Sequence, residues 1–254
     1  MVLGFLSLFI VIFGCCVGSF LNVLIYRLPR GLPFATGRSF CPKCRKKISW
    51  FDNIPLLSFF LLKGRCRHCH SPISWRYPVV ELTTGILFLL SYLSHLSFLS
   101  YLLFSGLIVV FFIDLEHQII PDEVLLPLII LFFIRDVTEI FASPLNTYFL
   151  ILNTFASGVG AFLFMFLIYL ITKGKGMGFG DVKLALLMGL VLGYPKIVVA
   201  FYLAFLTGAL FGIILILARK ATLKQRIAFG PFLTFSSIIS LLWGEKILQL
   251  TGLL

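Results

Sequence analysis

Long apolar runs alternate with short polar breaks over most of the chain, and this pattern predicts an all-helical polytopic membrane protein. A helix needs about 20 mostly apolar residues to span a bilayer, and lipid leaves no partners for an irregular backbone. We therefore expect about eight transmembrane helices, of which the sixth is short. They fall at residues 3–26, 79–94, 97–115, 124–141, 147–172, 182–194, 197–218 and 230–250.

One sizeable polar stretch, residues 27–77, interrupts this pattern between the first two helices. It is rich in proline, and its only apolar piece, residues 54–62, is too short to span a membrane. We expect that piece to be a small core element or to lie at the interface, and we see no internal repeat by eye. The predicted organisation is a first helix at 1–26, a loop domain at 27–77 and a transmembrane domain at 78–254.

The composition supports a membrane protein, because 60% of the residues are hydrophobic and only 12% are charged. Soluble domains carry about 25% charged residues. With eight spans, 18 of the 21 Lys and Arg residues fall on the same side as the 27–77 loop. The positive-inside rule then places this loop in the cytoplasm and both termini outside. The net charge of +11 is thereby explained by topology and by attraction to anionic lipid, not by nucleic-acid binding.

Four cysteines in the loop form two CxxC pairs separated by 21 residues: Cys41, Cys44, Cys66 and Cys69. This spacing predicts a structural zinc site, in which each pair supplies two thiolates to one tetrahedral ion. A small polar domain gains stability from such a metal. Two disulfides or a redox pair are the alternatives, and His68 or His70 could replace a cysteine as ligand.

Six of the ten acidic residues fall at the predicted cytoplasmic ends of helices: Glu81, Asp114, Glu116, Asp122, Glu123 and Asp181. Charged groups at membrane depth are costly, so those within or beside apolar runs are functional candidates. Asp122 follows a proline, and we expect it to cap the next helix. Three others, Asp136, Glu139 and Glu245, fall near outer loops, where we expect them to be solvated.

Asp114 and Asp181 are the sharpest candidates for chemistry. Asp114 ends a long apolar run, and Asp181 follows closely spaced glycines in the stretch 176–183. Two facing carboxylates share one proton, so one activates water while the other polarises a carbonyl and later acts as an acid. Spacing alone does not show that the two meet, and Asp181 could instead serve only as a helix cap.

The ordered set of motifs resembles the bifunctional type IV prepilin leader peptidase and N-methyltransferase family, whose peptidases are GxGD-type intramembrane aspartic proteases. The resemblance runs the length of the chain. It is carried by the segments 18–29 (GSFLNVLIYRLP), 76–81 (RYPVVE), 120–122 (IPD), 176–184 (GMGFGDVKL) and 229–232 (FGPF), together with Asp114 and the two CxxC pairs.

This resemblance implies that Asp114 and Asp181 are the catalytic pair and that 78–254 is the peptidase domain. The residues expected in the active-site loop are Gly178, Gly180, Lys183 and Asp122. Prepilins and pseudopilins would be cut at the cytoplasmic face of a bacterial inner membrane, after a glycine that ends a short basic leader. The new N-terminal residue would then be methylated with S-adenosylmethionine.

The resemblance further links the cysteine loop to methylation and implies that its four cysteines bind zinc. No motif identifies the residues that bind S-adenosylmethionine, and Asn22 and Glu81 are the candidates. A transporter whose carboxylates relay protons is a second hypothesis from the residues. A membrane scaffold whose zinc loop docks a cytoplasmic partner is a third.

Overall fold

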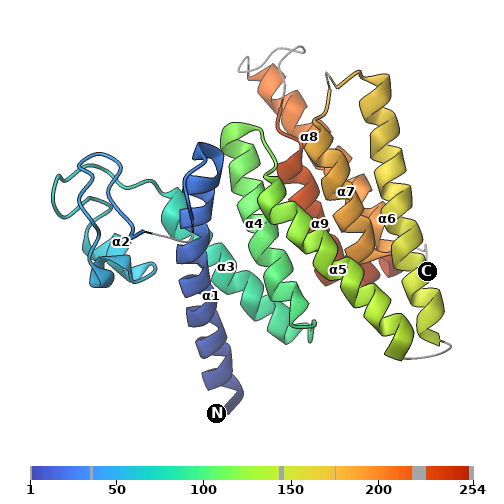
Figure 1. Cartoon of the computed structure of the whole chain (residues 1–254), viewed down its shortest axis with the longest axis horizontal. Helices are drawn as coiled ribbons and strands as arrows, with labels where there is room; N and C mark the ends of the chain where they lie inside the picture. The colour runs from blue at the N-terminus through green and yellow to red at the C-terminus, as the bar shows by residue number, and fades with distance from the viewer. Residues whose placement is uncertain (1, 35–36, 143–145, 175, 219–226, 252–254) are drawn as a thin grey trace. The chain divides into compact units, whose positions relative to one another are not determined.

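A computed structural model describes residues 2–34, 37–142, 146–174, 176–218 and 227–251, and within these ranges it contains helices and two isolated β-bridges but no strands. Eight long helices coincide with the eight predicted apolar segments (Figure 1). They are α1 (Val2–Arg27), α3 (Arg76–Leu93), α4 (Leu99–His117), α5 (Asp122–Ala142), α6 (Asn146–Ile171), α7 (Phe179–Leu192), α8 (Lys196–Leu217) and α9 (Gly230–Leu250).

Among the described residues, four helical segments are long and apolar enough to cross a membrane: Gly4–Arg30, Leu99–His117, Leu152–Ile171 and Lys196–Leu217. The chain is therefore an integral membrane protein, while the number of eight spans stays a prediction. Helix α7 has only 14 residues, as the short sixth segment led us to expect. Lys175 and residues 219–226, which contribute to the charge argument, lie outside the described residues.

The chain forms two compact units, residues 1–109 and 110–254. In the first unit α1 packs along α3 (Figure 1). Small residues allow the two backbones to approach closely: a Cβ at Gly14 would lie 2.8 Å from the Cα of Gly85, and one at Gly18 would lie 2.7 Å from the Cα of Glu81. Such contacts are typical of helix pairs in membranes.

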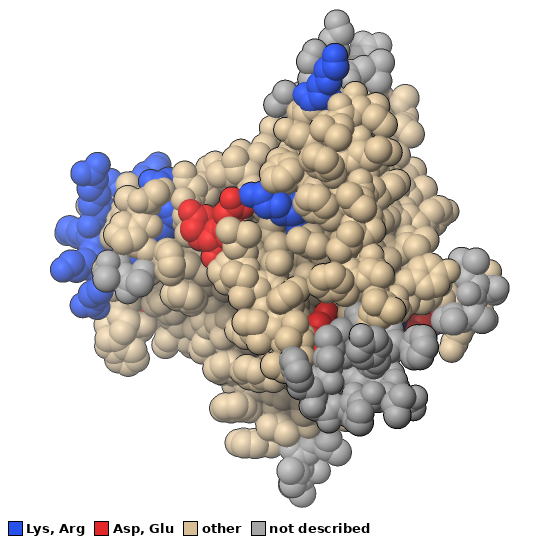
Figure 2. All heavy atoms as spheres, turned by 45° about the vertical axis from the view of Figure 1, so that its right-hand side comes forward, with Lys and Arg blue, Asp and Glu red and all other residues tan. Residues whose placement is uncertain are grey.

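The loop between α1 and α3 contains the short helices η1 (Leu28–Arg30), η2 (Trp50–Asn53) and α2 (Leu57–Leu61). On α2 the side chains of Ser58 and Phe59 are buried, and Phe59 packs against Trp75 with ring centroids 4.9 Å apart. Its other side chains are exposed. The apolar piece is thus a small core element with one open face. Figure 2 shows Lys and Arg side chains gathered on this loop.

The two cysteine knuckles repeat one another, which corrects our reading of the loop as free of repeats. In the first, the Cys41 N–H donates to Lys46 O and a β-bridge joins Phe40 to Lys47. In the second, the Cys66 N–H donates to Ser71 O and a β-bridge joins Arg65 to Pro72. Both knuckles end in the tripeptide Ile-Ser-Trp, at 48–50 and 73–75. That short identity was the sequence signal we missed.

In the second unit α7 packs against both α5 and α6, and α8 packs against α9. Helices α6 and α7 cross at glycines, since a Cβ at Gly189 would collide with the backbone of Ser157 and Gly158. A Cβ at Gly180, in the first turn of α7, would lie 2.9 Å from the Ile120 Cβ. Close contacts at these two glycines therefore hold α7 on two sides.

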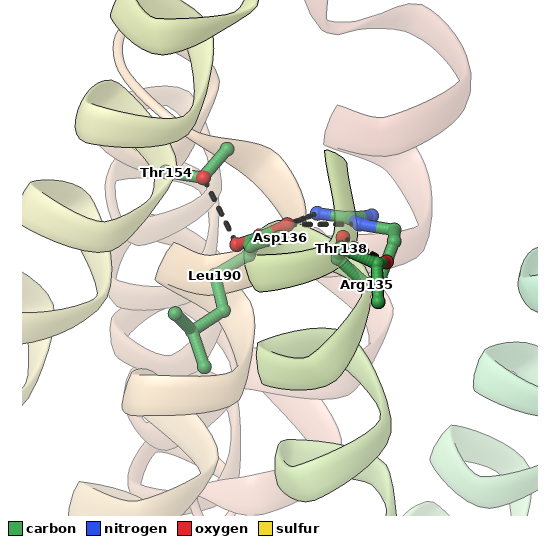
Figure 3. Close-up of polar contacts among 5 residues, drawn as sticks. All are labelled: Arg135, Asp136, Thr138, Thr154 and Leu190. Carbon is green, nitrogen blue, oxygen red and sulfur yellow. Dashed lines mark hydrogen bonds and ion pairs between the residues drawn. The ribbon is translucent and has the colours of Figure 1, made fainter. Parts of the chain in front are cut away.

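A buried polar network lies at the C-terminal half of α5 (Figure 3). Asp136 accepts from Arg135 at 2.5 and 2.9 Å and from the Thr154 hydroxyl at 3.0 Å, and Arg135 also donates to Leu190 O at 3.2 Å. Our expectation that Asp136 is solvated was wrong. Because it is buried, it is paired, and this pairing ties α5 to α6 and α7.

Candidate active site

A cavity of about 320 Å³ opens in the second unit, where several of its helices begin or end. The end of α4, the glycine-rich segment before α7 and the residues before α9 form its walls. The cavity includes the six residues of the second unit that the family resemblance assigns to the active site: Asp114, Asp122, Gly178, Gly180, Asp181 and Lys183. Glu116 and Glu123, also acidic residues at helix ends, do not line it.

Asp114 lies in the last turn of α4, and only 5% of it is exposed. The helix ends three residues later at His117, and the next residue, Gln118, adopts a left-handed φ of +56° and donates its N–H to Asp114 O at 2.9 Å. The side chain is buried beside this helix end. Its Oδ2 has no hydrogen-bond partner among the described residues. A buried oxygen without a partner is the kind of group that a bound water or substrate would satisfy.

Asp181 lies in the first turn of α7 and is 6% exposed. Its Oδ2 accepts a hydrogen bond from the Gly178 N–H at 3.1 Å, so the carboxylate does cap the helix. Its Oδ1 is buried and has no partner in the described part of the chain. The cap and the functional interpretation are therefore compatible, because one oxygen anchors the group and the other remains available.

The two carboxylates interact electrostatically across the cavity. Two negative charges in a mostly buried site repel each other, which favours retention of one proton by the pair. Such a proton belongs to the pair rather than to either residue. The geometry therefore provides one base and one acid beside the same empty volume, as aspartic hydrolysis requires.

At two glycines, Gly180 and Gly230, the backbone of α7 and of α9 lies in close contact with neighbouring side chains. Gly180 packs against the Ile120 side chain, which leaves no room for a side chain at this position. Gly230 is the residue that sequence reasoning missed. A Cβ there would lie 2.5 Å from Asp114 Oδ2, so any side chain at the start of α9 would displace the carboxylate. Its signal was the segment 229–232, to which the sequence assigned no role.

Asp122 and Lys183 form an ion pair at the cavity wall. Both Asp122 oxygens accept from Lys183 Nζ, at 2.6 and 2.7 Å, and Nζ lies 5.4 Å from the centre of the Phe179 ring. The expectation for Asp122 was a helix cap. The structure places it in the first turn of α5, where its carboxylate joins α5 to α7.

In the first unit, the four loop cysteines converge: the Sγ atoms of Cys41, Cys44, Cys66 and Cys69 lie within 4.8 Å of one another. A tetrahedral Zn²⁺ with Zn–S bonds of about 2.3 Å needs sulfur atoms about 3.8 Å apart. Cys41 Sγ and Cys69 Sγ are 3.8 Å apart. The Ser71 hydroxyl, 3.2 Å from Cys69 Sγ, lowers the pKa of that thiol to about 6. The donor set therefore fits zinc, and the thiols are not disulfide-bonded.

Asn22 and Glu81 lie together on the wall of a second cavity, in the first unit. Both side chains are buried, at 2% and 7% exposure. Asn22 Nδ2 donates to Tyr77 O at 3.1 Å, and Glu81 Oε2 accepts from the Leu56 N–H at 2.7 Å. The structure thus brings the two candidates into one pocket, in the unit that also holds the cysteine cluster.

Comparison with known proteins matches each of the two units to a protein-family model. Residues 12–95 match the bacterial peptidase A24 N-terminal domain, and residues 101–213 match the type IV leader peptidase family. No solved structure gave a significant match.

Three full-length relatives carry the name prepilin leader peptidase/N-methyltransferase. The Legionella pneumophila protein is 35% identical over 96% of this chain and 94% of its own. The Bacillus subtilis protein is 35% identical over 94% of both chains, and the Pseudomonas aeruginosa protein is 34% identical over 93% of this chain and 90% of its own. These matches support a peptidase rather than the transporter or scaffold hypothesis, and the chain belongs to the type IV leader peptidase family.

Proposed function

We propose that Asp114 and Asp181 form the catalytic pair with which this enzyme cleaves prepilins and pseudopilins. The cut falls on the cytoplasmic side, after the glycine that ends the leader, and the new N-terminus is methylated with S-adenosylmethionine. The observation that carries the proposal is the cavity in which both carboxylates are buried, each with one oxygen free of protein partners.

In the proposed reaction, the unpartnered oxygen of one aspartate acts on a bound water molecule and that of the other acts on the scissile carbonyl. The ionised carboxylate removes a proton as the water oxygen attacks the scissile carbonyl, while the protonated carboxyl donates to the carbonyl oxygen. Collapse of the tetrahedral intermediate breaks the C–N bond and the proton first taken from water moves to the leaving amine. A hydroxyl of the intermediate returns a proton to the other carboxylate, which restores the pair. The Gly178 N–H holds Asp181 in place throughout, because it binds the other oxygen.

The remaining residues of the cavity position the pair. Lys183 and Asp122 join the starts of α7 and α5, and thus hold the first turn that carries Asp181. Gly180 brings that turn against Ile120, and Gly230 leaves room for the Asp114 carboxylate. Gly178 supplies the amide cap.

We place the loop of residues 27–77 in the cytoplasm and both termini outside, with eight helices crossing the inner membrane of a bacterium. The distribution of Lys and Arg supports this orientation. The two carboxylates then face the cytoplasmic boundary, where an apolar pilin helix inserted from the lipid would present its leader junction.

We assign zinc to the four cysteines as a structural ion. Cys41, Cys44, Cys66 and Cys69 would hold it, and it would fold the loop by crosslinking two knuckles that bury little apolar surface. Zinc has no part in peptide cleavage under this assignment.

Mass spectrometry of a prepilin co-expressed with the enzyme tests the proposal directly. A mature chain that lacks the leader and carries one added methyl group supports both activities. Asp114→Asn and Asp181→Asn should each leave the precursor intact. Leader removal at the wild-type rate by either variant would refute the catalytic pair.

A further inference from the structure

We propose that one face of the cysteine loop inserts into the membrane that the protein itself spans, among anionic lipid headgroups. The loop carries six large apolar side chains that are 44–76% exposed. We call them the apolar face, and they are Trp50, Phe51, Leu57, Phe60, Leu61 and Trp75. Soluble proteins rarely expose apolar clusters of this kind to water, so the face requires a partner. Only the choice of the cytoplasmic leaflet rests on the orientation proposed above.

The part of this face on α2 and η2 forms one surface. On α2, Leu57, Phe60 and Leu61 are three and four residues apart, so they share one side of the helix. On the buried side, the Ser58 hydroxyl donates to Phe51 O at 2.9 Å. This bond fixes η2 against α2 and keeps the exposed rings of both elements together.

Trp75 joins this surface to the exposed side of α3. Its ring lies 4.9 Å from the Phe59 ring of α2. After Trp75, apolar side chains that are 45–47% exposed recur at helical spacing, at Val79, Leu82 and Ile86. Because α3 packs along the membrane-spanning helix α1, lipid covers this stripe. The apolar face is therefore continuous with a surface that already contacts lipid.

The loop also lies at membrane depth. The Leu56 N–H donates to Glu81 Oε2 at 2.7 Å, and a Cβ at Gly18 would lie 2.7 Å from the Glu81 Cα. Gly18 belongs to the membrane span of α1 and lies nine residues before Arg27, or about 13 Å along the helix axis. Helix α2 follows Leu56 directly, so it begins beside the span and not beyond its end, as Figure 1 shows.

The charge of the loop matches the headgroups of anionic lipids (Figure 2). Residues 27–77 hold eleven Lys and Arg but one acidic residue, Asp52, which pairs with Arg67 at 2.6 Å. Lys63 and Arg65 follow α2 directly, and both are exposed. Basic side chains are attracted to an anionic leaflet, and tryptophan rings favour the boundary between headgroups and acyl chains. The lipid interface supplies both partners to every molecule of an integral membrane protein.

Insertion also stabilises the cavity of about 440 Å³ in the first unit. Leu56 and Phe59 line this cavity from the loop, and Asn22 and Tyr26 line it from α1. If α2 swings away from α1, its apolar face leaves the lipid and enters water, which costs free energy. Lipid contact therefore holds the two walls of the cavity together.

Fluorescence of Trp50 in a bilayer tests the insertion. The chain has three tryptophans, so Trp75→Phe and Trp243→Phe leave Trp50 as the reporter, and the first change keeps a ring against α2. The protein is placed in vesicles of phosphatidylcholine and phosphatidylglycerol, with or without brominated acyl chains. Bromine should lower the Trp50 emission about twofold, because a ring at the interface reaches the upper acyl carbons.

Emission that ignores bromine but is quenched by acrylamide from the water would overturn the proposal. The apolar face would then belong to a second copy or to another protein. Prepilin cleavage and methylation are measured in the same vesicles, so a failure of the proposed function is recognised separately.

A double substitution tests the face itself. Phe60→Ser with Leu61→Ser removes side chains that are 62% and 72% exposed and keeps the buried side of α2. Quenching of Trp50 by bromine should fall about twofold or more, because the face loses much of its apolar area. The matched control is Leu32→Ser with Phe34→Ser, which removes the same two types of side chain from the same loop, outside the face. Its quenching should be unchanged.

Equal quenching in the two double variants contradicts the assignment of the face. Zinc content reports whether the loop is folded, and if the variant of the face loses zinc, the quenching of the unsubstituted reporter protein decides. Vesicles without phosphatidylglycerol test the charge. Bromine should quench Trp50 less in them, and raised salt should have the same effect in anionic vesicles. Quenching that is independent of both would refute the part assigned to anionic headgroups.

Discussion

The two cavities of this enzyme are built in different ways. The carboxylate cavity is walled by the ends of long helices, and at Gly180 and Gly230 the backbone lies against the side chains of Ile120 and Asp114. The cavity of the first unit shares a wall with a loop whose core is small and whose knuckles depend on four cysteines. We therefore expect cleavage to depend on helix packing and methylation to depend on the metal proposed for the four cysteines.

The largest effect is expected from removing either member of the catalytic pair. Asp114→Asn and Asp181→Asn remove the acid–base function, which contributes about 10²–10⁴-fold in general. Because the base on water and the acid on the carbonyl are needed in the same step, either change should reduce cleavage to background. A prepilin peptide with labelled leader, incubated with purified enzyme, gives the rate.

The same variants, given a peptide that already lacks its leader, test whether methylation is independent of the catalytic pair. Methylation of that peptide should match the wild type, since neither aspartate belongs to the first unit. Loss of methylation in both variants would show that the two activities share one site, contrary to the division described here.

A smaller but still large effect is expected at Gly230. In Gly230→Ala the added methyl lies 2.5 Å from Asp114 Oδ2, so the carboxylate or the start of α9 must shift. A misplacement of about 1 Å can cost about 100-fold in rate, and we expect a loss of that order in kcat for cleavage.

Gly160→Ala provides the control for this substitution, because it adds the same methyl group to a helix where nothing lies within 4 Å. Its cleavage rate should equal that of the wild type. Equal rates for Gly230→Ala would mean that the backbone at α9 does not position Asp114.

The sequence predicted most of this architecture because it is dictated by local patterns. Apolar runs of the right length gave the eight helices, and two CxxC pairs gave the cysteine cluster. Both follow from the requirement to satisfy the backbone in lipid and from the geometry of a tetrahedral ion. The pairing of Asp114 with Asp181 could be inferred only through the family resemblance, since 67 positions separate them and no periodicity connects them.

What the sequence could not provide depends on long-range packing. Gly230 matters because α9 starts beside Asp114, and the segment 229–232 by itself does not indicate which residue it contacts. Asp136 was expected in solvent, but Arg135 and Thr154 bury and pair it. The free Oδ1 of Asn22 appears only after two carbonyls from different helices have occupied its amide nitrogen.

Removal of the metal should reduce methylation by an intermediate amount, and it tests directly whether the two activities depend on different parts of the structure. Cys44→Ser, or chelation of the wild type, should abolish zinc binding and reduce methylation at least tenfold, because the loop wall of the first cavity loosens. Cleavage should fall by no more than about threefold, in keeping with the independent helix packing of the second unit. Zinc content, methylation and cleavage are measured on the same preparation.

Cys16→Ser is the matched control for this substitution, since Cys16 is an exposed cysteine of α1 and not part of the cluster. It should retain zinc and both activities. Parallel loss of cleavage and methylation on zinc removal would show that the metal supports the whole enzyme, and the contrast between the two cavities would not hold.

The smallest effect is expected from the ion pair between Lys183 and Asp122. Its side chains are 24% and 49% exposed, so solvent screens the pair, and such pairs contribute about 0–1 kcal/mol. Lys183→Met should therefore lower cleavage by about fivefold or less, and Asp122→Asn should do the same.

Because the pair acts through one contact, the double variant should be no worse than the more impaired single variant. Additive losses would instead indicate that the two residues contact the substrate separately, and raised salt should weaken the wild type but leave the double variant unchanged.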